Sequence, residues 1–357
     1  MRVGVVGVGP VGDRIIRVID ERNFPVDGEI IVMATSERME SLGGREFLVR
    51  QTAPELFEGL DVVFFAGREG AKGASSEWGQ IAIDAGAVII DNGGDFRMDP
   101  NCPLVVPEVN MDHVTSETKL IASPNCSTIQ MVVALAPLHR AAGIKRICVS
   151  TYQSVSGWGL KAMDEIKRQM GQLVNGEELT FDPSIFTHAI AYEYVPHIDR
   201  FDESGYTREE LKMIKETRKI MGEPDMQITA TTVRVPVIVG HGESINVQFE
   251  NEMDAEKALE ILRDPEQSEG VAVMDGPATD PNAMGVRGDE LEREYPVSRD
   301  LEQPELADMV LVGRVRDDET MPNTINLWCV ADNLRKGAAT NTVQIAEKMR
   351  ERGLLPG

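Results

Sequence analysis

The 357-residue chain contains few cysteines, few aromatic residues and a clear deficit of positive charge. Its four cysteines form no C-x-x-C pair and its five histidines are scattered, so we expect neither a disulfide framework nor a metal site. Lysine and arginine number 36 against 59 aspartates and glutamates, which gives a net charge of −23. This balance argues against a nucleic-acid or membrane partner, and any anionic substrate must be bound by locally placed cations.

The sequence also has no long hydrophobic run. No apolar stretch approaches the roughly 18–20 residues that a membrane-spanning helix needs. The apolar residues 3–11 are punctuated by glycine and lead directly into Asp13 and Arg14, without the cleavage site of a signal peptide. We therefore expect a cytoplasmic, thiol-reducing location. The composition, 42% hydrophobic and 27% charged, is that of a globular protein, and the length allows two domains.

The beginning of the chain has the pattern of a dinucleotide-binding loop. A β-rich run over residues 2–6 precedes the glycine pattern G-x-G-x-x-G, and residues 13–21 have helical character. This order allows the backbone to approach a pyrophosphate at a helix N-terminus. Pro10 removes one backbone donor from the loop. The residues expected to bind the cofactor are Gly7, Gly9, Pro10, Val11 and Gly12.

The next predicted strand, residues 30–34, leads to the side chains that would choose between nicotinamide cofactors. It is followed by Ser36, Glu37 and Arg38. An acidic side chain at this place holds the ribose diol of NAD, whereas an arginine receives the 2′-phosphate of NADP. Because both types are present, the residues alone leave both cofactors open.

Further along, alternating strands and helices predict a Rossmann-like, doubly wound parallel sheet in an α/β protein. Its strands are expected at 61–66 and 87–91, with a helix over 77–85 between them. After residue 126, longer β-rich segments predict an α+β domain with a mixed sheet. These segments are residues 144–153, 228–239 and 244–250, and a helix over 161–173 is expected to cover one face of their sheet. A capping box from Thr207 to Glu210 marks the start of another helix. The remaining predictions are an acidic surface insertion over 275–308, a buried strand over 327–331 and a closing helix over 341–352.

Cys126 stands where a helix is predicted to begin. Pro124 and Asn125 form a turn pattern, and the apolar residues that follow have helical spacing. The amide groups at a helix N-terminus favour an anion, so this position suits a nucleophilic thiolate. Taken alone, the cysteine is as well explained as a small buried hydrophobic residue.

The residues around Cys126 decide between these readings. The segment Ser123-Pro124-Asn125-Cys126-Ser127-Thr128-Ile129-Gln130-Met131 resembles the active-site block of bacterial aspartate-semialdehyde dehydrogenases. Further blocks similar to that family follow in the family's order over nearly the whole chain: Asp91-Asn92 with Phe96-Arg97, 103–110, 150–157, Val233-Arg234-Val235-Pro236 with Gly240-His241, and 332–339.

The resemblance implies a phosphorylating aldehyde oxidoreductase. Its reaction is the NADP-dependent reductive dephosphorylation of 4-aspartyl phosphate to L-aspartate 4-semialdehyde through a cysteine thioester, in lysine, threonine and methionine biosynthesis. The implied organisation is an NADP-binding domain of residues 1–125 and 330–357 and a catalytic and dimerisation domain of residues 126–329, in a homodimer or homotetramer. An N-acyl-glutamyl-phosphate reductase and a non-catalytic NADP-binding paralogue are the alternatives.

The resemblance also assigns roles to particular residues. Cys126 would be the nucleophile and acyl carrier, Gln153 would orient the intermediate, and His241 would be the general acid/base. The alternative interpretation is that His241 is an ordinary core or surface histidine without a catalytic role. The substrate contacts would be Arg234 with the α-carboxylate, Glu209 with the amino group, and Arg97, Asn125 and Lys212 with phosphate.

For the cofactor, a serine and an arginine spaced like Ser36 and Arg38 face the extra phosphate of NADP in this family, which favours NADP over NAD. Ser156, Gly157 and Asn333 would touch the cofactor. Two features depart from the family pattern: the glycine loop is one residue shorter, and Trp158 stands where the family has a small residue.

Overall fold

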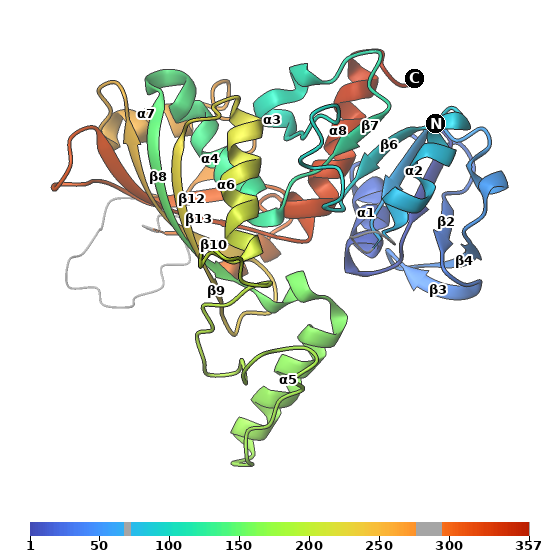
Figure 1. Cartoon of the computed structure of the whole chain (residues 1–357), viewed down its shortest axis with the longest axis horizontal. Helices are drawn as coiled ribbons and strands as arrows, with labels where there is room; N and C mark the ends of the chain where they lie inside the picture. The colour runs from blue at the N-terminus through green and yellow to red at the C-terminus, as the bar shows by residue number, and fades with distance from the viewer. Residues whose placement is uncertain (68–72, 276–294, 357) are drawn as a thin grey trace. The chain divides into compact units, whose positions relative to one another are not determined.

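The computed structural model describes residues 1–67, 73–275 and 295–356, and the chain divides into two compact units. Unit 1 comprises residues 1–126 and 337–357, and unit 2 comprises residues 127–336. Each unit contains one sheet, of seven strands in unit 1 and six in unit 2 (Figure 1). This is the α/β class with a doubly wound first unit and a mixed second sheet that the sequence predicts.

The sheet of unit 1 has the order β3-β4-β2-β1-β5-β6-β7. Its strands are β1 (Val3–Val6), β2 (Ile31–Ala34), β3 (Arg38–Leu42), β4 (Arg45–Gln51), β5 (Val62–Phe65), β6 (Val88–Asp91) and β7 (Leu120–Ala122). All pairs are parallel except the hairpin β3–β4, which the sequence analysis did not predict. Every residue of β1, β5 and β6 is buried, as expected of parallel strands covered on both faces.

Unit 1 contains four α-helices in its described residues: α1 (Pro10–Glu21), α2 (Ala74–Asp84), α3 (Pro107–Asn110) and α8 (Thr340–Glu351). Helix α1 begins at Pro10, earlier than the predicted residue 13. Proline is well suited to the first helical position, because its amide would have no intrahelical partner there. A bidentate ion pair of Arg22 with Glu347, 2.7 Å from Nη2 to Oε2, joins the end of α1 to α8.

The sheet of unit 2 has the order β11-β12-β13-β10-β8-β9. Its strands are β8 (Ile144–Gln153), β9 (Gln227–Arg234), β10 (His241–Phe249), β11 (Val271–Val273), β12 (Val310–Asp317) and β13 (Thr324–Ala331). Two pairs are parallel and three antiparallel. The predicted strand 228–239 was too long: β9 ends at Arg234, before Pro236, which has no amide to donate. Gly240, at φ 94°, then turns the chain into β10.

The described helices of unit 2 are α4 (Cys126–Ala142), α5 (Leu160–Val174), α6 (Arg208–Met221) and α7 (Ala255–Arg263). Helix α6 packs against β9, and α7 packs against β11 and β12. The predicted capping box is present: Thr207 Oγ1 accepts from Glu210 N, and Glu210 Oε2 accepts from Thr207 N. Shorter helices in the described parts of the two units are Pro54–Phe57, Met111–His113, Val155–Trp158 and Ser298–Glu302 of 3₁₀ type and Arg335–Ala339 of π type; the first two belong to unit 1.

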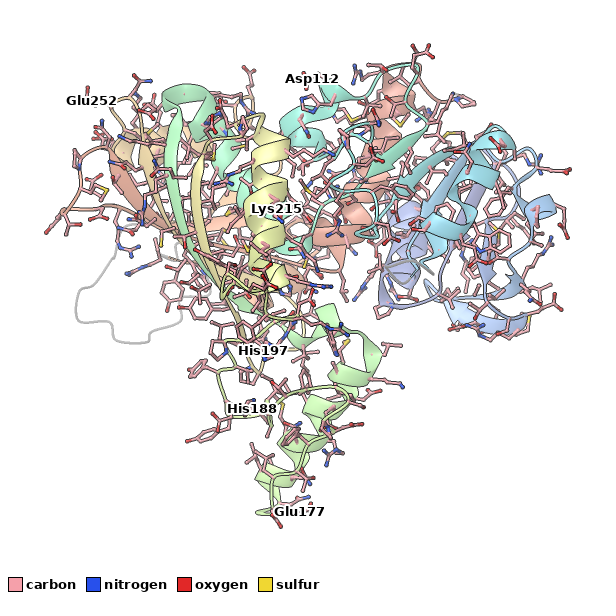
Figure 2. All side chains as sticks on the ribbon, in the orientation of Figure 1. Asp112, Glu177, His188, His197, Lys215 and Glu252 are labelled. Atoms are coloured by element: carbon pink, nitrogen blue, oxygen red, sulfur yellow. The ribbon has the colours of Figure 1, made fainter. Side chains whose placement is uncertain are left out.

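The prediction that helix α5 covers one face of the sheet is wrong. The helix projects from the sheet as an arm, and the chain returns alongside (Figure 1). Figure 2 shows Glu177 at the far end of this arm and His188 and His197 on the returning segment. The arm has its own small core, in which Ile166 packs with Ile190. Gln169 Oε1 accepts the amides of Ile190 and Ala191 at 2.8 and 3.0 Å, so the two halves of the arm are joined.

Most of the predicted acidic insertion, residues 276–294, lies outside the described residues. Within the described ranges, no helix is long and apolar enough to cross a membrane. Those ranges also contain no group of three or more His, Cys, Asp or Glu side chains arranged to hold a metal ion.

Candidate active site

Cys126 is the first residue of α4, the position that the turn pattern predicts. Strand β7 ends at Ala122, and residues 123–125 connect its carboxyl end to the helix. Cys126 is half-buried, and Asn125 before it is 7% exposed. The start of a helix at the carboxyl edge of a parallel sheet is a common place for ligands, because its amides and positive dipole end favour anions.

Arg97 lies at the same edge of unit 1 and is almost completely buried. Its Nε donates to the carbonyl of Ser123 at 2.9 Å, and its Nη2 donates to the carbonyl of Asn92 at 2.8 Å. The guanidinium is therefore fixed against the loops that follow β6 and β7. Nearby, Asp91 Oδ1 accepts the amide of Gly93 at 2.8 Å, and burial raises the pKa of Asp91 to about 6. Unit 1 thus brings Arg97, Asn125 and Cys126 to one sheet edge.

The glycine loop has the conformation that its sequence predicts. Gly7 has φ 109°, and a Cβ there would stand 2.7 Å from the backbone of Ala66. A Cβ on Gly12 would stand 2.0 Å from the Gly7 carbonyl oxygen, so only glycine lets α1 approach β1 this closely. Gly9 is the N-cap of α1, has open space around its α-carbon, and provides no side-chain cap for the first amides of α1.

Ser36 and Arg38 are brought together at the end of β2. Arg38 Nη1 donates to the Ser36 carbonyl oxygen at 3.0 Å and to Ser36 Oγ at 3.1 Å. Arg38 Nε also donates to Glu40 Oε2 at 2.8 Å, although Arg38 is itself exposed. Arg38 is the first residue of β3, so it belongs to the hairpin and not to a simple loop. A cation and a hydroxyl group are therefore displayed side by side where a 2′-phosphate would lie.

Unit 2 brings the predicted residues Gln153, Glu209 and His241 close together. Gln153 Nε2 donates to Glu209 Oε1 at 3.1 Å and lies 3.4 Å from His241 Nε2, while Gln153 Oε1 accepts from Thr151 Oγ1 at 3.1 Å. Glu209 Oε2 accepts from Lys212 Nζ at 3.3 Å. Strands β8 and β10 and helix α6 thus place four of the predicted side chains in one network.

The environment of His241 fixes its charge and its tautomer. The ring is fully buried, and burial together with the charge of Arg234 lowers its pKa from 6.5 to about 3. Its Nδ1 accepts from the Ser154 amide at 3.0 Å. A neutral imidazole whose Nδ1 accepts must carry its proton on Nε2. His241 is therefore a neutral ring with an Nε2–H group, next to Gln153.

The predicted residues Arg234, Gly157, Ser156 and Asn333 surround this ring. Arg234 Nη1 donates to the Ser154 carbonyl oxygen. A Cβ added to Gly157 would lie 3.7 Å from both Arg234 Nη1 and His241 Nε2, so the glycine faces both groups. Asn333 Oδ1 accepts from Ser154 Oγ, Ser156 Oγ and Gly240 N, each at 3.0 Å. Asn333 therefore holds together the loops on either side of His241.

The sequence patterns did not indicate three buried polar residues that the fold brings together: Glu243 on β10, Cys329 on β13 and Gln130 on α4. Glu243 is completely buried, and burial raises its pKa well above 4.5. Cys329 Sγ donates to Glu243 Oε2 at 3.7 Å, and Gln130 Nε2 donates to Cys329 Sγ at 3.9 Å. The spacing could have indicated Glu243, because residues two apart on a strand, such as 241 and 243, share a face.

Comparison with known proteins finds relatives over nearly the whole length of the chain. Residues 2–117 match the model of the semialdehyde dehydrogenase NAD binding domain, and residues 135–336 match the model of the semialdehyde dehydrogenase dimerisation domain. The chain is 45% identical to an aspartate-semialdehyde dehydrogenase of Aquifex aeolicus, over 99% of both chains. It is 38% identical to that of Bacillus subtilis, again over 99% of both. The chain belongs to the aspartate-semialdehyde dehydrogenase family.

Solved aspartate-semialdehyde dehydrogenases share its fold. The crystal structure of aspartate semialdehyde dehydrogenase II from Vibrio cholerae complexed with ASA has a TM-score of 0.84 and 40% identity, and each chain covers 98% of the other. A probable aspartate-semialdehyde dehydrogenase from Pseudomonas aeruginosa, at 25% identity, has a TM-score of 0.82.

Trp158, the departure from the family pattern, closes the 3₁₀ helix Val155–Trp158 and is 53% exposed. Its neighbour Gly157 faces Arg234 and His241. The indole is therefore largely exposed and directly follows, in the chain, a glycine that faces His241.

Proposed function

We propose that this chain catalyses the reductive dephosphorylation of 4-aspartyl phosphate to L-aspartate 4-semialdehyde with NADPH, and the reverse reaction with NADP+ and phosphate. The network of Gln153, Glu209, Lys212 and neutral His241 is the observation that carries this proposal. A cysteine at a helix start supplies the nucleophile that such acyl chemistry requires. In this role the enzyme acts in the cytoplasm, in lysine, threonine and methionine biosynthesis.

The residues of unit 1 fit NADP. The uncapped first amides of α1 and the open space at Gly9 suit a pyrophosphate, and the pair of Ser36 and Arg38 suits a 2′-phosphate. Pro10 supplies no donor, so the contacts fall to the amides of Val11 and Gly12. When bound, NADPH supplies the hydride of the reaction. Ser156 and Gly157 would contribute further cofactor contacts, and Asn333 would hold them in position.

The proposed chemistry at Cys126 consists of an acyl transfer, the reduction of the resulting thioester and the release of the aldehyde. The thiolate attacks the carbonyl carbon of the acyl phosphate, the bond from that carbon to the phosphate oxygen breaks, and phosphate leaves with the electron pair. The resulting thioester receives a hydride at the same carbon. The carbon–sulfur bond then breaks, which releases the aldehyde and restores the thiolate on Cys126.

His241 and Gln153 would serve the carbonyl oxygen during these steps. Each step turns that oxygen into an oxyanion, and a preorganised donor in a buried site stabilises such a charge strongly. The Nε2–H group of neutral His241 is this donor. Because burial lowers the pKa of His241 to about 3, the ring stays neutral, and its Nε2–H group would stabilise the oxyanion by a hydrogen bond without transferring the proton. Gln153, held by Thr151 and Glu209, orients the intermediate.

The substrate is a zwitterion with an added phosphate, and the site offers one partner for each charge. Arg234 would bind the α-carboxylate by a bidentate pair, and Glu209 would bind the amino group. By the resemblance to the family, Arg97, Asn125 and Lys212 would bind phosphate. All of these residues except Lys212 are at least nine-tenths buried, which strengthens their interaction with charges.

The functional division of the chain follows the same proposal. Residues 1–125 with 330–357 bind NADP, and residues 126–329 carry the catalytic groups and the dimer contact. The match to the semialdehyde dehydrogenase dimerisation domain supports a homodimer, or a homotetramer built from dimers.

The proposal is tested by phosphate-dependent reduction of NADP+, and separately of NAD+, by L-aspartate 4-semialdehyde. We expect turnover with NADP+ that disappears without phosphate. Cys126→Ala should abolish turnover and leave NADP+ binding intact, since the thiol acts on the carbonyl. Turnover that persists in Cys126→Ala would refute the covalent mechanism, and inactivity of the wild type with both cofactors would refute the reaction.

A further inference from the structure

The ammonium group of Lys212 lies between two carboxylates from different parts of unit 2. Nζ donates to Glu209 Oε2 at 3.3 Å, within the same helix, and to Asp199 Oδ2 at 3.2 Å, in the segment that precedes α6. The side chains of Lys212 and Asp199 are 28% and 25% exposed, so both charges are partly shielded from water. Glu209 and Lys212 have roles in the proposed reaction, and Asp199 has none there.

The backbone around Asp199 fixes the position of its carboxylate. Asp199 has φ 64°, in the left-handed region that few L-residues other than Asn and Asp enter. Its Oδ1 accepts from the Arg200 amide at 2.8 Å. The Arg200 carbonyl oxygen in turn accepts from the amide of Arg208, the first residue of α6, at 2.8 Å.

On its other side, the same segment is tied to the strand of Arg234. Val195 and Arg234 exchange two backbone hydrogen bonds, at 3.0 and 2.8 Å. Figure 2 shows His197, two residues before Asp199, where the arm returns toward the sheet. Asp199 is therefore anchored both to the strand that would bind the substrate carboxylate and to the helix that carries Lys212.

The two carboxylates that hold Lys212 differ in their other hydrogen-bond partners. Glu209 shares its oxygens between Lys212 and Gln153, and it is the group that would bind the substrate amino group. Among the residues that the structure describes, the Asp199 carboxylate bonds Lys212 and the adjacent Arg200 amide and nothing else. When a second ammonium arrives at Glu209, Asp199 is the carboxylate that can continue to pair with Lys212.

We propose that Asp199 is a positioning residue, which keeps the Lys212 ammonium in the substrate site while the substrate amino group occupies Glu209. This inference rests on the proposed function, in which Lys212 binds phosphate. Without Asp199, Lys212 and the substrate ammonium would compete for the carboxylate of Glu209. Each cation is held more strongly by a carboxylate that it does not have to share with the other. Binding of the semialdehyde and of phosphate would both weaken.

Two substitutions separate the charge of Asp199 from its backbone role. Asp199→Asn keeps a residue that tolerates left-handed φ and can still accept from the Arg200 amide, and removes only the charge. Asp199→Gly keeps the backbone conformation and removes the side chain. We expect both to raise KM for phosphate and for the semialdehyde by about tenfold with kcat within about twofold, the effect of one partly exposed charge-assisted bond. A purely conformational role predicts wild-type constants for both variants.

The matched control is Asp202→Asn. Asp202 is an exposed carboxylate of the same segment whose Oδ1 accepts from the Ser204 amide at 2.7 Å, so its loss should leave both KM values unchanged. Equal rises in KM for Asp202→Asn and Asp199→Asn would show that the rise comes from the loss of surface charge in general, and would overturn the inference.

A double-mutant cycle with Lys212→Met identifies the partner through which Asp199 acts. We expect Asp199→Asn to have no further effect on KM for phosphate once Lys212 is Met, since coupled residues are not additive. An undiminished effect in that background would overturn the inference alone. If Lys212→Met itself left KM for phosphate unchanged, the phosphate role of Lys212 in the proposed function would fail, and this inference with it.

Discussion

The buried neutral His241 makes a quantitative prediction about stability in acid. Its pKa is lowered from 6.5 to about 3 by burial first and by the nearby Arg234 second. Between these two pH values the unfolded chain binds a proton at this site and the folded chain does not. The free energy of unfolding contributed by His241 is therefore complete above pH 6.5 and is lost as the pH falls toward about 3.

The size of the effect follows from 1.36 kcal/mol for each unit of pKa difference. Over the whole window the loss would be roughly 5 kcal/mol, and by about pH 5 it would be roughly 2 kcal/mol. The variant His241→Asn cannot titrate, and its side-chain oxygen can still accept from the Ser154 amide as Nδ1 does. We expect it to lack this part of the acid destabilisation.

The assay is urea unfolding of the wild type and His241→Asn at a series of pH values from about 7.5 to about 5, a range that begins above the unfolded pKa of histidine. Other titrating groups, such as His139 and Asp91, are common to both proteins, so their contributions cancel in the difference. The difference in unfolding free energy should shift in favour of the variant by roughly 2 kcal/mol on acidification. A difference that does not change with pH would show that His241 is not a buried neutral ring, and would refute the reasoning about its charge.

The remaining predictions concern the oxyanion donor, the cofactor and the buried carboxyl. His241→Asn should lower kcat by roughly 10²–10³, the usual cost of removing one donor to an oxyanion; a near-wild-type rate would remove His241 from the mechanism. Arg38→Ala should raise KM for NADP+ and leave KM for NAD+ unchanged, measured at saturating semialdehyde; an equal rise for both cofactors would remove the 2′-phosphate role. Glu243→Gln should stabilise the protein increasingly above pH 4.5, by up to about 1.4 kcal/mol per pH unit, because the raised pKa of Glu243 costs stability as the unfolded chain ionises. Thermal unfolding at several pH values measures this gain, and a gain independent of pH would contradict it.

Local patterns along the chain predicted those parts of the fold that local physics determines. The apolar runs of β1, β5 and β6 are continuous because both faces of these strands are buried, and the glycines of the first loop are required by contacts with Ala66 and with Gly7. The capping box at Thr207 is likewise a local arrangement of side chain and backbone. The start of α4 at Cys126 follows from the turn before it.

The sequence analysis failed where the structure depends on distant partners. The hairpin β3–β4 was missed because its side chains are largely exposed, including Met39 at 61% and Leu48 at 49%, so no apolar alternation indicates it. Helix α5 has an amphipathic pattern, which indicated a sheet face, yet its apolar side packs on the returning chain of its own arm. Asp199 belongs to no motif, and only the fold brings it to Lys212.

The site also explains how an acidic protein can bind an anionic substrate. With a net charge of −23, the chain repels anions at long range, so affinity must come from a few cations at short range. Each predicted cation is fixed by the protein itself: Arg97 by two carbonyl oxygens, Arg234 by the carbonyl of Ser154, and Lys212 by two carboxylates. Side chains held in this way lose little further freedom when substrate binds, and preorganisation of this kind is the main source of electrostatic catalysis. Lys212 differs from Arg97 and Arg234, because it is held by carboxylates and they are held by backbone carbonyl oxygens. A carboxylate such as that of Glu209 can exchange its pairing with Lys212 for a pairing with a charged group of the substrate, whereas a neutral carbonyl oxygen cannot form an ion pair.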